Sequence, residues 1–232
     1  MLSTDYVCCH TLLKQRTSSL HKILDNTPLL KKLMSHSLSV SDYQRTLTCL
    51  YAWYQYTESL LDKELCRFGV LELPGFQARI NKSALLRSDL AALDIPDTNH
   101  LSGMDFALPN TNLFTLLGIC YVVEGSALGG LVLGPRLRKV LPTINATSFY
   151  DVYGEHKMQV FREVMMQIQQ LLNTQYDLSQ HRLHENVTPH IDYQTAQESL
   201  LQGAEAAFSS LIDWVTVYDQ DIPMMQTAKE YC

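Results

Sequence analysis

The stretch YVVEGSALGGLVLG, residues 121–134, has the apolar character of a buried helix but carries glycines in its interior. Each glycine inside a helix costs roughly 1 kcal/mol relative to alanine, so Gly125, Gly129 and Gly130 require a compensating gain. Gly125 and Gly129 are four residues apart and therefore share one face, with Tyr121 one turn earlier on that face. A helix without Cβ atoms on this face can bring its backbone against another surface.

Two kinds of surface fit such a face. In a soluble core, small residues let two helices pack closely. A large flat ligand can also lie directly on the backbone, with Ser126 supplying one hydroxyl in an otherwise apolar slot. A membrane helix is a third reading, because Gly125 and Gly129 match the Gly-x-x-x-Gly dimerisation pattern, but the central Glu124 and the short apolar runs beside it argue against a span. The glycines alone leave packing and ligand binding open.

The composition is typical of a folded, cytoplasmic protein. The chain has 232 residues, of which 46% are hydrophobic and 18% charged, enough for one domain with a substantial core. The net charge is −6 and the basic residues are scattered, so no nucleic-acid surface is indicated. The first residues lack the pattern of a secretory signal. The six cysteines are irregularly spaced, which favours reduced thiols over a disulfide framework.

Helical periodicity dominates the chain, and almost no segment alternates as a strand does. We therefore predict an all-α, single-domain multihelical bundle of about seven helices over residues 1–232. A polar connection near 174–191 precedes the last helix. The clearest helical segments are 6–24, 41–68, 77–93, 112–134, 148–173 and 192–219.

Capping and breaking residues set the expected helix ends. Ser41-Asp42 suits the start of the second long helix, and Asn110 or Thr111 can cap the glycine-containing one. Pro135 is expected to end or kink that segment.

Two blocks resemble a known family. Residues 121–130 are similar to the distal-helix signature of bacterial biliverdin-producing heme oxygenases, particularly the phytochrome-associated branch. Residues 13–25, LKQRTSSLHKILD, resemble that family's N-terminal helix, whose histidine is the proximal heme ligand. Softer matches are Tyr153-Gly154, followed by Phe161 where the family usually has tryptophan, and the run from Ala204 to Trp214. The resemblance extends over about residues 9–217.

The resemblance implies a multihelical fold and a reaction. Heme would be cleaved to biliverdin, Fe²⁺ and CO with O₂ and external electrons. His21 would be the proximal ligand of the heme iron, and Gly125, Ser126 and Gly129 would form the catalytic distal wall. Many relatives carry aspartate where this chain has Ser126, which leaves the route of proton delivery open.

Further heme contacts are expected from Gly130, Tyr121 and Lys14. Gly130 belongs to the row beside Gly125 and Gly129, and Tyr121 is a candidate partner for a propionate. Lys14 precedes His21 by seven residues on the same helical face, a displacement of roughly 10 Å at 1.5 Å per residue, and so can pair with a propionate carboxylate. An ordinary solvated lysine explains Lys14 equally well. Glu124 is turned about 100° from Gly125 and is expected to be structural or to lie at the rim.

Other readings remain open. A non-catalytic heme-binding or heme-delivery protein would keep the fold without turnover, and a helical interaction module would bind no heme. The enzyme reading implies an electron-donor protein or small reductant and a possible biliverdin-accepting photoreceptor as partners, without nucleic acid or membrane. The loosely spaced His181, His184, Glu185 and His190 suit a metal site poorly.

Overall fold

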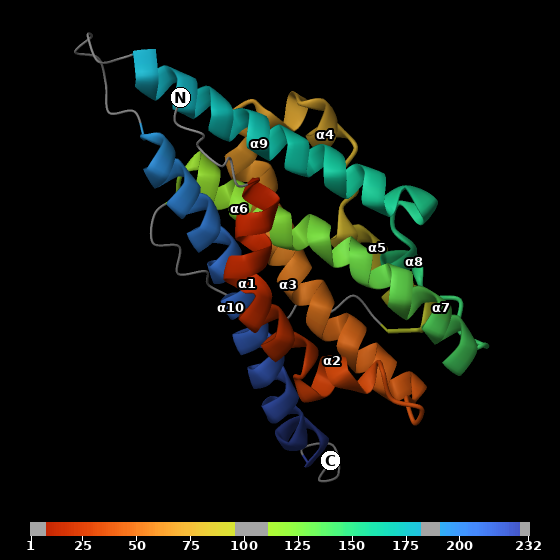
Figure 1. Cartoon of the computed structure of the whole chain (residues 1–232). Coiled ribbons are helices and arrows are strands. Elements are labelled where there is room, and N and C mark those ends of the chain that lie inside the picture. Colours follow the sequence, from red (N-terminus) through yellow and green to blue (C-terminus); the bar gives the residue numbers. More distant parts are fainter. Residues whose placement is uncertain (1–7, 96–110, 182–190, 228–232) are drawn as a thin grey trace.

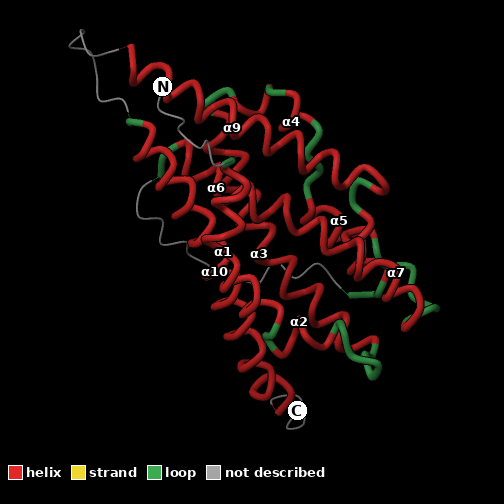
Figure 2. Tube along the Cα trace, in the orientation of Figure 1, coloured by secondary structure: helices red, strands yellow, loops and turns green. Residues whose placement is uncertain are grey.

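The computed structural model describes residues 8–95, 111–181 and 191–227, and within these ranges every regular element is helical (Figures 1 and 2). This confirms the all-α fold. The α-helices are α1 (Cys9–Asp25), α2 (Pro28–Lys32), α3 (Val40–Cys66), α4 (Pro74–Gln77), α5 (Lys82–Ala92), α6 (Leu113–Gly125), α7 (Gly130–Val140), α8 (Ser148–Asp151), α9 (Lys157–His181) and α10 (Tyr193–Thr227). Short 3-10 helices are η1 (Val70–Glu72), η2 (Ser126–Gly129) and η3 (Gly154–His156).

Helix α6 lies at the centre of the bundle. It packs against α10, α3 and α9, and α1 runs beside α10 along one side (Figure 1). Leu116, Leu117, Ile119 and Cys120 of α6 are fully buried. They belong to one hydrophobic core to which all ten described α-helices contribute residues. The described helices therefore form one unit around one core.

Helices α6 and α10 pack closely against each other, and two glycines permit it. A Cβ atom on Gly118 would collide with the carbonyl oxygen of Leu200, and one on Gly203 would collide with the carbonyl oxygen of Thr115. Each helix thus presents a bare position to the backbone of the other. This crossing fixes the central helix, from which the glycine segment continues.

The glycine segment forms one almost continuous helical path, α6–η2–α7 (Figure 1). Its N-cap is Asn112, whose side-chain oxygen accepts a hydrogen bond from the Thr115 backbone N–H at 3.0 Å; the expectation of Asn110 or Thr111 is wrong. Pro135 does not end the path, because α7 continues to Val140. Leu131, whose carbonyl loses its helical partner at Pro135, lies on the exposed side where water can replace that bond.

Because of local interactions, other helices begin or end at residues that differ from the predicted ones. Helix α3 begins with a capping box, in which Ser39 accepts from the Asp42 N–H and the Asp42 carboxylate accepts from the Ser39 N–H, so the cap lies two residues before Ser41. The predicted helix 148–173 is divided into α8, η3 and α9, because Tyr153 and Gly154 both adopt positive φ. Helix α9 also continues to His181, into the predicted polar connection.

Residues 182–190, with His184, Glu185 and His190, lie outside the described residues. In the described part, no group of three or more His, Cys, Asp and Glu side chains is arranged to hold a metal ion. Cys8, Cys9, Cys49, Cys66 and Cys120 are free thiols there.

One described segment, Leu113–Val140, is long and apolar enough to cross a membrane by length and composition. Its packing gives another explanation. Glu124 within it is only 1% exposed and pairs with two basic side chains, and α10, α3 and α9 cover the α6 part. The segment is apolar because it forms the core of the bundle.

Candidate functional site

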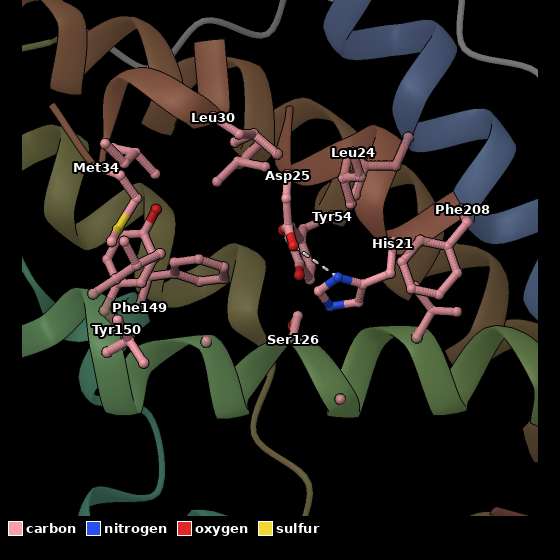
Figure 3. Close-up of a pocket in the computed structure, with 18 of the residues that line it drawn as sticks. His21, Leu24, Asp25, Leu30, Met34, Tyr54, Ser126, Phe149, Tyr150 and Phe208 are labelled. Atoms are coloured by element: carbon pink, nitrogen blue, oxygen red, sulfur yellow. Dashed lines mark hydrogen bonds and ion pairs between the residues drawn. The ribbon is translucent and has the colours of Figure 1, made fainter. Parts of the chain in front are cut away.

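A cavity of about 490 Å³ lies between α1 and the path α6–η2–α7. This volume falls within the ~300–1,000 Å³ of typical small-molecule sites. Figure 3 shows His21 and Phe208 at one end, Met34, Phe149 and Tyr150 at the other, and Ser126 between them. The lining residues are mostly apolar: His21, Leu24, Asp25, Leu30, Leu33, Met34, Leu50, Tyr54, Tyr121, Val122, Gly125, Ser126, Gly129, Val132, Leu133, Phe149, Tyr150, Phe208 and Leu211.

His21 is oriented by its own helix. Its Nδ1 lies 2.9 Å from a carboxylate oxygen of Asp25, one turn further along α1, and its ring is 5.7 Å from that of Phe208. Because a carboxylate only accepts, neutral His21 donates from Nδ1 and keeps the lone pair of Nε2 free. The side chain is 62% exposed, so Nε2 can be reached by a ligand. An imidazole held in this way is suited to bind a metal centre.

The opposite wall is bare main chain. Gly125 and Gly129 both line the cavity, and a Cβ atom on Gly129 would meet nothing within 4 Å. A Cβ atom on Gly125 would make an ordinary contact at 3.6 Å with Phe161, which lies behind it. No protein atom of the described chain therefore requires glycine at these two positions. The space next to them is open to a ligand.

Gly130 has a different role from the one expected. It is buried and does not line the cavity, and a Cβ atom there would collide with the carbonyl oxygen of Tyr150. Its missing side chain lets α7 pack on α8. The helical row beside Gly125 and Gly129 turns toward the protein at Gly130, so Gly130 lies outside the lining of the cavity to which the sequence had assigned it.

These contacts predict opposite effects for two glycine substitutions. Gly118→Ala should lower the free energy of unfolding by about 1–3 kcal/mol, because overpacking against a neighbouring backbone forces the helices apart. Gly129→Ala should raise it by up to about 1 kcal/mol, because alanine is the better helix former and has free space. Urea titration of the two ligand-free variants measures both values. Equal destabilisation would contradict the assignment of Gly129 to an open wall.

Lys14 is exposed and does not line the main cavity. It belongs to a separate shallow recess on α1 with His10, Thr11, Gln15 and Ser18. Burial and the charge of Lys14 lower the pKa of His10, so this imidazole is neutral at pH 7. Any contact of Lys14 with a ligand would be made by a group that extends out of the cavity.

Tyr121 lines the cavity and contacts His10 of this recess. Its ring faces His10 at 6.3 Å and Phe161 at 6.1 Å. Burial raises the pKa of its phenol, although a hydrogen bond with Thr17 of α1 opposes this effect. Tyr121 thus holds a defined position against α1 at the edge of the cavity.

The polar groups next to the glycine wall are few and neutral. The Ser126 hydroxyl donates to the Val123 carbonyl of its own helix at 2.7 Å and also interacts with the Tyr54 phenol. Burial raises the pKa of Tyr54, so the phenol stays protonated. Among the described lining residues, Asp25 is the one carboxylate, and it is bound to His21 on the other wall. The glycine wall itself carries no ionisable side chain.

Glu124, the residue before Gly125, anchors this wall from outside. Its carboxylate accepts hydrogen bonds from Arg79 Nε and Lys82 Nζ, both at 2.8 Å, and from the Tyr153 hydroxyl at 2.9 Å. Burial alone raises the pKa of Glu124, but the charges and hydrogen bonds of Lys82 and Arg79 outweigh it and hold the pKa below its ordinary value. Glu124 is therefore structural and buried, not a rim residue.

The end of the cavity away from His21, called the inner end below, contains residues that were not expected from the sequence. Helix α2 was not expected at all, yet Leu30, Leu33 and Met34 in and after it close this end. Arg136 of α7 holds that segment by donating to the carbonyls of Leu33 at 3.0 Å and Met34 at 2.6 Å. The Pro28 that begins α2 was the available signal, since proline favours the first turn of a helix.

The described helices enclose a mostly apolar cavity in which an oriented imidazole faces bare main chain. A family model described as heme oxygenase matches residues 9–217, and the chain belongs to the heme oxygenase family. In fold the chain is similar to heme oxygenase-1 from the cyanobacterium Synechocystis sp. PCC6803, solved in complex with heme, with a TM-score of 0.62 and 15% sequence identity. That similarity covers 96% of this chain and 99% of the other. No curated protein matches the sequence.

Proposed function

We propose that the chain is a heme oxygenase that cleaves heme to biliverdin, Fe²⁺ and CO with O₂ and electrons from an external donor. One observation carries the proposal: His21 Nε2 and the open backbone at Gly125 and Gly129 lie on opposite sides of the same cavity. Heme needs one protein ligand to its iron and a flat apolar slot for its ring. His21 is the candidate for the ligand, and the apolar cavity is the candidate for the slot.

Each side chain then has a role toward heme. His21 would bind the iron through Nε2, with Asp25 fixing the tautomer and the ring orientation. The Gly125–Gly129 wall would limit the space on the opposite face to small molecules such as O₂. The carboxylates of heme would extend toward α1, where Lys14 and Tyr121 are the candidate partners. Heme would be the substrate and, through its iron, would also supply the redox chemistry when bound.

The neutral wall fits this reaction. A strong acid beside bound oxygen would promote scission of the O–O bond before the ring is attacked, whereas Ser126 and Tyr54 offer only hydroxyl groups. Such hydroxyls can hold ordered water and pass protons without carrying charge. Ser126 is also the residue on which the proposed phytochrome-associated branch depends. In that setting the protein would be cytoplasmic and its product available to a biliverdin-accepting photoreceptor.

A heme carrier is the alternative. It is favoured by the Ser126 hydroxyl, which already donates to Val123 and so leaves the described wall without a free proton donor. A carrier would bind heme through His21 and release it unchanged.

Aerobic turnover separates the two functions. The protein is mixed with hemin and a reductant in air, and absorbance is followed with and without catalase, which removes free peroxide. An enzyme loses the Soret band and forms biliverdin and CO at rates that catalase does not change. A Soret band that persists for many minutes would support the carrier, and no spectral change on adding hemin would reject both.

A further inference from the structure

The Tyr150 side chain has a property that other buried tyrosines lack. It is 5% exposed, and its hydroxyl has no hydrogen-bond partner in the described part of the chain. The Tyr43 hydroxyl, in contrast, donates to the Ala146 carbonyl at 2.6 Å, and that of Tyr153 donates to Glu124 at 2.9 Å. A buried hydroxyl without a partner is unfavourable for folding, so it calls for an explanation.

The surroundings of Tyr150 prevent it from turning toward another partner. Asp89 accepts hydrogen bonds from the backbone N–H groups of Ser148 and Phe149, each at 2.9 Å, and this fixes the start of α8. The Tyr150 carbonyl lies against Gly130 of α7. Its ring packs edge-on against Phe149 at 4.9 Å and faces Tyr43 at 6.4 Å. The hydroxyl is thus held in place by contacts that do not satisfy it.

Tyr150 lines the cavity at the end away from His21 (Figure 3). Burial, and the nearby Tyr54 and Asp89, raise its pKa, so the hydroxyl keeps its proton. Leu30, Leu33 and Phe149 also line the cavity and have no polar side-chain atom, so a ligand atom that accepts a hydrogen bond at this end would find the Tyr150 hydroxyl as a donor. Met34 lies at the same end, and its unbranched, half-exposed side chain can move when a ligand enters.

We propose that Tyr150 is a ligand-binding residue whose hydroxyl donates a hydrogen bond to an acceptor oxygen at the inner end of the cavity. The identity of the ligand rests on the proposed function. If the heme carboxylates extend toward Lys14, the edge of the ring at Tyr150 carries no oxygen. The acceptor is then either a water molecule enclosed with heme or a carbonyl oxygen that ring cleavage leaves on the open tetrapyrrole.

The test compares Tyr150→Phe with Tyr43→Phe. Both variants remove one hydroxyl from neighbouring buried rings, but only Tyr150 lines the cavity. Without ligand, Tyr43→Phe should lower the midpoint of thermal unfolding by about 2–4 °C, because it leaves the Ala146 carbonyl unpaired. Tyr150→Phe should leave the midpoint unchanged or raise it.

Binding should show the opposite pattern. Absorbance titrations with hemin and with biliverdin give the dissociation constants. Tyr150→Phe should weaken binding by about three- to tenfold, the value of one hydrogen bond, while Tyr43→Phe should bind as the wild type does. Weaker binding of both probes identifies water as the acceptor, and weaker binding of biliverdin alone identifies a tetrapyrrole oxygen; both support the proposal.

If Tyr150→Phe binds hemin and biliverdin with the affinity of the wild type, the proposed ligand-binding role of Tyr150 is wrong. A loss of thermal stability in Tyr150→Phe equal to that in Tyr43→Phe would also overturn it, because the hydroxyl would then have a partner within the protein. If the wild type binds neither hemin nor biliverdin, the proposed function fails instead. The wild-type titration therefore separates the two failures.

Discussion

The His21→Ala variant is expected to lose hemin affinity by at least about 100-fold, because removing an iron ligand costs no less than the 10–100-fold typical of groups that merely orient one. The Soret band of the wild-type complex should be replaced by the spectrum of free hemin. Added imidazole, which can occupy the vacated space, should restore part of the bound spectrum. Absorbance titration with and without imidazole measures both effects.

His156→Ala is a matched control for this variant. The His156 side chain is 66% exposed and lies 3.7 Å from a carboxylate oxygen of Glu155, so it is a surface imidazole in a similar setting to His21. It lies outside the cavity. Its removal should leave the hemin spectrum and affinity unchanged. If His21→Ala also retains them, hemin binds elsewhere on the protein and the proposed function is wrong.

Glu124→Ala is expected to cause the largest loss of stability, about 3–5 kcal/mol, because it leaves buried positive charge without its partner. Lys82 is 0% exposed and Arg79 8%, so water cannot replace the carboxylate in place. Asp151→Ala removes another carboxylate from an ion pair, with Arg138, but both side chains are about half exposed. It should cost about 1 kcal/mol or less. Urea titration at pH 7 compares them, and equal losses would contradict the buried network.

The Glu124 carboxylate also causes part of the pH dependence of stability. Its pKa is lower in the folded protein than the ~4.3 of an unfolded glutamate, so the unfolded state binds more protons between the two values. The stabilisation is complete above the unfolded pKa and is lost as pH falls through the folded one. Glu124→Gln, which is more conservative than alanine, should therefore differ most from the wild type at neutral pH and less below about pH 4. A difference that grows on acidification would have the wrong sign.

The all-helical fold and the long helices could be predicted from periodicity because their apolar faces repeat over many turns. The helix ends depended on single hydrogen bonds. Both Ser39 and Ser41 can act as caps, and the choice of Ser39 becomes visible only when Asp42 is seen to complete the capping box. The break at Tyr153 was missed because a tyrosine rarely adopts positive φ.

The candidate site was predictable where chemistry and spacing are local. His21, Gly125, Ser126 and Gly129 line one cavity. The helix-face argument indicated the glycines, whereas His21 was selected through the family resemblance. The pairing of His21 with Asp25, four residues later, also lies in the sequence but was overlooked. Gly130 could not be separated from Gly129 by spacing, because its neighbour, the Tyr150 carbonyl, is distant in the chain. No sequence pattern indicates Tyr150, because what distinguishes it is that its hydroxyl has no hydrogen-bond partner in the described residues.

The glycine wall is supported at its two ends by different neighbours. Before it, α6 is fixed by Gly118 against α10, and after it, α7 is fixed by Gly130 against α8. The position of this wall therefore depends on two glycines, Gly118 and Gly130, that do not line the cavity themselves. Side-chain volume added at Gly118 or Gly130 would shift the wall and change the width of the cavity, so the shape of the proposed binding site depends on residues outside its lining.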